Sequence, residues 1–159
     1  MEKRKFYIMC GVPGSGKSTW IRNHFPEGKL LVSRDAIRFA LVAENEPYFS
    51  REDEVVDRFN KEIVNFGMMG DVIIDATHSN RASRKKVLDL LVANFDPEMI
   101  EVYFIYLNTS YEECIARNNQ RQGRAKVPRD AIDRMWARHS TPSRLENPII
   151  VKGVWVVEE

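Results

Sequence analysis

The chain has 159 residues, of which 43% are hydrophobic, and this predicts one domain, residues 1–159, with a hydrophobic core of its own. Its 24 basic and 23 acidic residues leave a net charge of +1. This balance excludes an overall basic excess, so any contact with nucleic acid has to come from a local basic patch.

The compartment is predicted from two features of the sequence. The two cysteines, Cys10 and Cys114, have neither metal-ligand spacing nor the density of a disulfide framework, which favours a reducing compartment. The amino terminus has no apolar segment typical of a signal peptide, and no apolar run has membrane-spanning length. We therefore expect a cytoplasmic protein with no membrane partner.

The first predicted elements are a strand over residues 6–10, a glycine loop, and a helix that ends near residue 25, before a turn at Pro26 and Gly28. The loop, GVPGSGKS, fits the phosphate-binding pattern of glycine, four residues and Gly-Lys-Ser/Thr. A strand, glycine loop and helix in this order direct the helix amino terminus at phosphate. We therefore predict ATP or another nucleoside triphosphate, bound with Mg²⁺.

Each position of this motif has an expected role. Lys17 reaches the β- and γ-phosphates, where its charge assists catalysis, and the Ser18 hydroxyl ligates Mg²⁺. The predicted nucleotide-binding residues of the loop are Gly11, Pro13, Gly14, Ser15, Gly16, Lys17, Ser18 and Thr19.

The next elements are a strand over residues 30–32 and a helix over residues 33–41. Asp35 and Arg38 are three residues apart, so they share a face of this helix. At the exit of the strand, the carboxylate suits a general base and the arginine suits a phosphate on the acceptor. The alternative is that Asp35 only favours the positive end of the helix dipole and that Arg38 is its solvated partner.

A helix over residues 51–66 precedes a strand over residues 71–77 that ends in polar residues. Asp75 has the position of a Walker-B carboxylate, which helps to hold Mg²⁺, although an aspartate after a strand also simply begins turns. Thr77 and His78 are expected at the rim of the cleft. We assign His78 no role beyond a contact with the acceptor.

The rest of the chain predicts a helix around residues 87–95, a strand over residues 100–107, a capping box at Ser110, a helix from Pro128 and a strand over residues 149–157. Short apolar strands that alternate with helices predict a parallel sheet covered on both faces. Because ligands of such sheets bind at the carboxyl ends of the strands, we expect the glycine loop, Asp35 and Asp75 to face one cleft.

Two clusters of basic residues suit an anionic partner. The first opens the helix after residue 80, where positive charge opposes the helix dipole, which weakly indicates an anionic partner. It consists of Arg81, Arg84, Lys85 and Lys86. The second contains no acidic residue and suits a mobile lid over the triphosphate, although a solvated helix end has the same pattern. It consists of Arg117, Arg121, Arg124 and Lys126.

Taken together, these motifs resemble the kinase domain of phage-type polynucleotide 5′-kinases over nearly the whole chain, to about Trp136. The likeness includes the glycine loop through Trp20, SRDAIR from residue 33, DAT from residue 75, and Lys126 through Pro128. It also includes three arginines: Arg84, Arg117 and Arg121. The chain departs from the family pattern in one extra residue between Arg121 and Pro128, and in His78, where asparagine is common.

The resemblance implies an α/β fold, a P-loop NTPase of the adenylate-kinase-like type with five parallel strands and an arginine-bearing lid. It implies transfer of the γ-phosphate of ATP to the 5′-hydroxyl of DNA or RNA, with Asp35 as general base and Arg38 on the phosphate beside the acceptor hydroxyl. Arg121, or Arg124 because of the extra residue, is then the lid arginine. Arg117 becomes a nucleotide contact, and Thr77 and Val127 become acceptor contacts.

Two other functions stay open. A small-molecule kinase acting on a sugar, nucleoside or antibiotic shares the loop and lid, but gives Arg38 little to hold. A nucleotide-dependent switch would bind or hydrolyse ATP without an acceptor. The sequence also leaves open self-association, and which end-repair partner proteins the enzyme serves.

Overall fold

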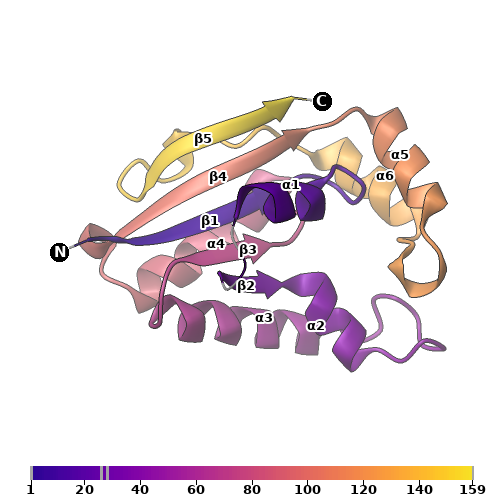
Figure 1. Ribbon diagram of the computed structural model, residues 1–159, viewed down its shortest axis with the longest axis horizontal. Coiled ribbons are helices and arrows are strands. Elements are labelled where there is room, and N and C mark those ends of the chain that lie inside the picture. Colours follow the sequence, from indigo (N-terminus) through magenta and orange to yellow (C-terminus); the bar gives the residue numbers. More distant parts are fainter. Residues whose placement is uncertain (1, 26, 28, 159) are drawn as a thin grey trace.

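The computed structural model describes residues 2–25, 27 and 29–158, which form one parallel sheet with helices on both faces (Figure 1). The turn expected at Pro26 and Gly28 lies outside the described residues. The strands are β1 (Arg4–Cys10), β2 (Leu30–Ser33), β3 (Val72–Asp75), β4 (Ile100–Asn108) and β5 (Val151–Glu158). The helices are α1 (Lys17–His24), α2 (Arg34–Leu41), α3 (Glu52–Gly67), α4 (Arg81–Asn94), α5 (Tyr111–Gln120) and α6 (Arg129–Arg138), with the 3₁₀ turns η1 (Pro97–Met99), η2 (Gly123–Ala125) and η3 (Arg144–Glu146).

The strand order is β2-β3-β1-β4-β5, and every neighbouring pair is parallel. The central strand β1 places Phe6 beside Val72 of β3 and beside Val102 of β4. The chain moves from β1 to one edge through β2 and β3, and then to the other through β4 and β5. This confirms the predicted five-stranded parallel sheet, and it places a topological switch point beside β1, where ligands of such sheets bind.

Alternation along β1 explains the two layers of core. Phe6, Ile8 and Cys10 face the larger core, which includes Phe59 of α3 and Leu91 of α4. The intervening Met9 faces the smaller core on the other side, with Trp20 and Ile21 of α1. Figure 1 shows α1 in front of the sheet and α4 behind it.

A third apolar cluster supports the end of the molecule beyond the sheet. It joins Ile115 of α5, Ala131 and Ile132 of α6, and Val127 in the segment between these helices. This cluster anchors both ends of the predicted lid. Among the described residues, no helix combines the length and apolarity needed to cross a membrane.

Among the differences from the predicted elements, two strand boundaries and one helix cap have a clear cause in the structure. β3 ends at Asp75 and not at residue 77, because the Thr77 carbonyl turns to accept a hydrogen bond from the Gly11 amide at 2.7 Å. β5 begins at Val151 and not at residue 149, because the Val151 amide still closes a turn on the Asn147 carbonyl. At Ser110 the hydroxyl caps α5 as expected, but Glu113 pairs with Arg117 at 3.1 Å and does not complete the capping box.

Candidate active site

A cavity of about 440 Å³ lies at the carboxyl ends of β1, β2 and β3, between the glycine loop, α2 and the lid segment. The structure brings most of the predicted site residues to its wall: Pro13, Gly14, Gly16, Lys17, Ser18, Thr19, Asp35, Arg38, Asp75, Thr77, Arg117, Arg121 and Val127. Gly11 and Ser15 do not reach it, and line instead a much smaller cavity of about 10 Å³. Residues from five separate stretches of chain thus share one wall.

The glycine loop has a backbone that side chains would obstruct. Gly14 has φ +86°, and a Cβ placed on it would lie 2.4 Å from the Cys114 carbonyl oxygen of α5. The loop is tied to the end of β4 by Thr109, whose hydroxyl donates to the Ser15 carbonyl at 2.7 Å. α1 then begins at Lys17 without a side-chain cap, so its first amides stay available to an anion. This geometry fits the phosphates of a nucleotide.

Lys17 and Asp75 are the opposite charges at the base of the cavity. The Lys17 ammonium donates to the carbonyls of Gly11, at 2.8 Å, and Val12, at 3.2 Å. Burial lowers the pKa of Lys17, and the negative charge of Asp75 opposes that shift. Burial likewise raises the pKa of Asp75, and the charge of Lys17 opposes it. The two residues stabilise each other's charged forms in a partly desolvated place.

The oxygen donors beside Lys17 fit Mg²⁺. The described residues contain no cluster of three or more His, Cys, Asp or Glu side chains that would hold a metal alone. Mg²⁺ characteristically takes one or two protein oxygens and completes its shell with water and phosphate. Ser18 and Asp75 line the same cavity and supply such oxygens.

The side of the cavity formed by α2 and the start of α3 holds a network centred on Arg38, whose side chain is only 6% exposed. Its Nε donates to Glu52 Oε1 at 2.7 Å, and its Nη1 donates to Asp35 Oδ1 and to the Tyr48 hydroxyl. Tyr48 in turn donates to Asp35 Oδ1 at 3.0 Å. Burial, and next the charge of Asp35, raise the pKa of Tyr48 to about 12, so the phenol remains a donor. Asp35 is therefore held by two donors while its side chain stays 55% exposed.

Sequence reasoning missed Tyr48 and Glu52. The sequence predicts only a loop before α3, and predicts Glu52 only as part of a helix. A tyrosine in a loop and a glutamate in a first helical turn are common without any site, so no periodic pattern singles them out. Their roles arise because α2 and α3 are packed together, which the one-dimensional pattern does not encode.

The two candidate lid arginines, Arg121 and Arg124, point to different places in the structure. Arg121 lines the cavity beside the glycine loop, whereas Arg124 turns away to the end of α2. There its Nη2 donates to the carbonyls of Phe39 and of Val42, the latter at 2.8 Å. Arg117 donates to the Gly14 carbonyl at 3.2 Å. Of the two alternatives, Arg121 is the arginine on the cavity wall.

Val127 has more than one set of contacts. It is 3% exposed and packs within the cluster between α5 and α6. Its amide and carbonyl are both paired with the Asn118 side chain, at 3.0 and 2.9 Å. Its position at the cavity wall is therefore fixed by the fold of the lid base.

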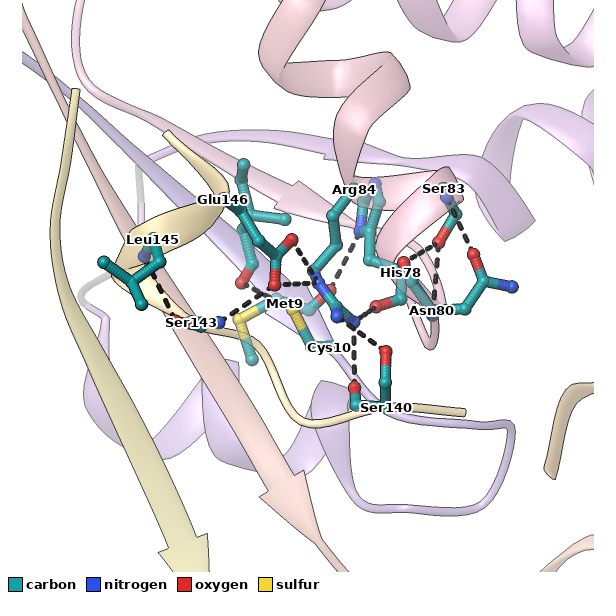
Figure 2. A network of polar contacts seen from close by, with 11 residues as sticks. Met9, Cys10, His78, Asn80, Ser83, Arg84, Ser140, Ser143, Leu145 and Glu146 are labelled. Atoms are coloured by element: carbon teal, nitrogen blue, oxygen red, sulfur yellow. Dashed lines mark hydrogen bonds and ion pairs between the residues drawn. The ribbon is translucent and has the colours of Figure 1, made fainter. Parts of the chain in front are cut away.

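Two sequence expectations fail behind the glycine loop (Figure 2). His78 is not at the rim: it is 2% exposed, and its Nδ1 hydrogen-bonds the Met9 carbonyl at 2.9 Å. Arg84 does not await an external anion, because its Nε donates to both oxygens of Glu146, at 2.9 and 3.2 Å. Its other nitrogens donate to the carbonyls of His78 and Ser140 and to the Ser140 hydroxyl.

This network around Arg84 supports the site from behind. It joins the start of α4, the segment that follows β3, and the chain between α6 and β5. Asn80 caps α4 by accepting from the Ser83 amide at 2.8 Å. The segment that carries Thr77 is thus held on both sides, by the Gly11 amide and by Arg84 through the His78 carbonyl.

Comparison with known proteins defines the class of this site. The parallel sheet and phosphate-binding loop are those of the P-loop kinase fold. A family model described as an AAA domain matches residues 6–142, so the chain belongs to that family. Membership implies a nucleotide-binding site. Comparison with curated proteins found no significant match.

Solved structures that resemble the chain include a component of an RNA repair complex, a putative kinase and a sugar kinase. One is the Pnkp1/Rnl/Hen1 RNA repair complex, with 24% identity over 87% of this chain and 44% of the other, and a TM-score of 0.67. A putative kinase from Chloroflexus aurantiacus has 12% identity over 99% of this chain and 86% of its own, with a TM-score of 0.71. A sugar kinase from Janibacter sp. HTCC2649 has 20% identity over 98% of this chain and 85% of its own, with a TM-score of 0.61. The chain spans less than half of the protein it matches in the repair complex.

Proposed function

We propose that residues 1–159 act as an ATP-dependent polynucleotide kinase that phosphorylates the 5′-hydroxyl end of DNA or RNA. The observation that supports this most is the Asp35–Arg38 pair, which lies in the same cavity as the phosphate-binding loop. The exposed carboxylate suits an acceptor hydroxyl. The buried arginine beside it suits a phosphate on the same acceptor, because guanidinium groups bind phosphate with several parallel donors.

In the proposed reaction, Asp35 accepts the hydroxyl proton while the acceptor oxygen forms a bond to the γ-phosphorus. The bond from that phosphorus to the bridging oxygen breaks, and ADP leaves. Tyr48 and Arg38 orient the Asp35 carboxylate through their hydrogen bonds. Lys17 and Arg121 stabilise the charge on the transferred group.

The remaining cavity residues have positioning roles in this proposal. The glycine loop, Thr19 and Arg117 bind ATP, and Thr77 and Val127 contact the acceptor. Ser18 and Asp75 would hold Mg²⁺, which would neutralise phosphate charge when bound. The Arg38 Nη2 makes no hydrogen bond within the described part of the chain, which leaves it for the acceptor phosphate.

A small-molecule kinase is the second candidate, since the Janibacter sugar kinase matches over 85% of its own length. Polar Tyr48 and Glu52 at the acceptor side would also suit the hydroxyl groups of a sugar. For the first candidate, the likeness to a component of an RNA repair complex suggests end-repair proteins as partners. A cytoplasmic location and self-association are expectations from the sequence alone.

Asp35→Asn tests the proposal directly. With a 5′-hydroxyl oligonucleotide and γ-labelled ATP, we expect the rate of transfer to fall by about 10²–10⁴-fold, the typical contribution of a general base, while the Kd for ATP stays within about twofold. Asp53→Asn, an exposed aspartate on α3, serves as the matched control and should leave both values unchanged. Transfer by Asp35→Asn at the wild-type rate would contradict the proposed base.

A further inference from the structure

The cations of the cavity differ in whether they already have a partner. Arg38 is paired with Asp35 and Glu52, and Arg117 with Glu113. Lys17 donates to two carbonyls of its own loop. Within the described ranges, only Arg34 and Arg121 line the cavity without a side-chain hydrogen bond or an ion pair to another residue. Arg121 belongs to the donor side of the cavity, so Arg34 is the unpaired cation of the acceptor side among the residues that the structure describes.

Arg34 is held in a place that is costly for a cation. It is the first residue of α2, where the helix dipole disfavours positive charge. Its Nε is buried and has no hydrogen-bond partner among the described residues. Burial lowers the pKa of Arg34; the charge of Glu52 opposes that shift and the charge of Arg38 adds to it. Such an arrangement costs stability unless an anion enters the cavity.

The side chain of Arg34 is nevertheless fixed. Its guanidinium carbon lies 4.3 Å from the centre of the Phe59 ring of α3, a stacked cation–π contact. This contact orients the guanidinium plane while leaving its edge free to donate. A rigid arginine with unused donors is suited to two-pronged recognition of phosphate.

We propose that Arg34 is a specificity-determining residue that binds an anionic phosphate group of the acceptor, the phosphodiester next to the nucleotide that presents its 5′-hydroxyl. This rests on the proposed function and refines it. Arg34 directly precedes Asp35, so one turn of α2 presents both the base for the hydroxyl and the cation for the phosphate. Arg34 shares this phosphate with the Arg38 Nη2, which is free among the described residues, so an acceptor with a neutral group at that position leaves both donors without a partner and is a poorer substrate.

A cycle of enzyme and substrate changes tests this. Wild-type protein and Arg34→Gln are each assayed with a 5′-hydroxyl oligonucleotide whose first linkage is a phosphodiester or an uncharged methylphosphonate. For wild type, we expect the neutral linkage to lower kcat/KM for the acceptor about tenfold to a hundredfold, the range of a charge-assisted hydrogen bond. Arg34→Gln should show a similar loss on the phosphodiester. Its further loss on the methylphosphonate should be smaller than that of wild type, because only the Arg38 Nη2 still favours the charged linkage.

Matched variants separate binding from folding. Arg34→Lys, which keeps the charge, should recover part of the preference for the charged linkage, and a purely structural role would not produce this. Arg58→Gln, an exposed arginine on α3, should behave as wild type, and the KM for ATP should be unchanged in Arg34→Gln. An increased KM for ATP in Arg34→Gln, with the acceptor preference intact, would place Arg34 on the donor side and overturn the proposal.

The failures of the two proposals differ. If wild-type protein labels both oligonucleotides and Arg34→Gln retains the full preference for the phosphodiester, this inference is wrong and the proposed function stands. If wild-type protein labels no 5′-hydroxyl end, the proposed function is wrong, and this inference falls with it.

Discussion

Some residues near the site support it from inside the core, without lining the cavity. His78 shows this most clearly, because it is enclosed behind the glycine loop and yet hydrogen-bonds the Met9 carbonyl through its Nδ1. Its backbone has φ +40°, a conformation that asparagine tolerates better than most residues. A side chain of this kind supports the site without touching a substrate.

The buried His78 makes the stability of the fold sensitive to acid. Burial, and next the charge of Arg34, lower the pKa of His78 from 6.5 to about 3. Below pH 6.5 the unfolded chain therefore binds a proton that the folded chain does not bind until about pH 3. The free energy of unfolding falls with decreasing pH in this window, by about 1.4 kcal/mol per pH unit, and is unaffected above it.

His78→Asn should remove this dependence while suiting the local backbone. In urea unfolding at about pH 7.5 and about pH 5.0, we expect wild type to lose about 2 kcal/mol more than His78→Asn between the two conditions. Equal losses in both proteins would show that His78 is protonated in the fold and is not buried as a neutral imidazole.

At the scale of elements, the buried Arg84–Glu146 pair joins α4 to η3. Their side chains are 1% and 4% exposed, so removing one charge leaves the other without compensation. We expect Glu146→Gln to lower the free energy of unfolding by about 3–5 kcal/mol, measured by chemical denaturation. Arg84→Met combined with Glu146→Leu should lower the free energy of unfolding by less than the sum of the two single changes, because no unpaired charge remains.

An exposed pair on the same helix provides the control. The Lys85 Nζ lies 2.6 Å from the Asp89 Oδ2, and the two side chains are 71% and 60% exposed. Asp89→Asn should change the free energy of unfolding by no more than about 0.5 kcal/mol. A similar, small effect at Glu146 would mean that the buried pair does not hold these elements together.

Arg124 connects the lid to the helix that carries the proposed base. Its two hydrogen bonds end on carbonyls at the end of α2, and its guanidinium carbon lies 5.0 Å from the centre of the Phe39 ring. Arg124→Ala should release the lid, which we expect to appear as faster amide hydrogen exchange in residues 121–127 and as slower transfer with little change in ATP affinity. Arg138→Ala, exposed at the end of α6, is the control. Unchanged amide hydrogen exchange in residues 121–127 of Arg124→Ala would contradict the prediction that Arg124 holds the lid against α2.

For the whole molecule, sequence predicted the architecture better than the site. Alternating apolar strands and helices were sufficient for the parallel sheet, because periodicity and order decide that architecture. The glycine loop determined one wall of the cavity, because its motif is local. Asp35 and Arg38 were also paired correctly, since a spacing of three residues on a helix brings side chains together.

What sequence missed depends on contacts between distant segments. Glu146 is 62 residues from Arg84, so the local pattern around Arg84 indicates an external anion and gives no sign of the internal partner. The orphaned Nε of Arg34 becomes apparent only once α2 is packed on Phe59 of α3. A polar loop residue such as His78 is usually exposed, which predicts the rim, but the turn after Thr77 carries its side chain inward.

The proposed acceptor, a nucleic-acid end, is tested most directly by a competition between substrates. Wild-type protein receives γ-labelled ATP, Mg²⁺ and equal concentrations of a 5′-hydroxyl oligonucleotide, the same oligonucleotide with a 5′-phosphate, and a free sugar, glucose. We expect label on the 5′-hydroxyl strand only. Label on the sugar, with none on the oligonucleotide, would contradict the proposed function and identify a small-molecule kinase.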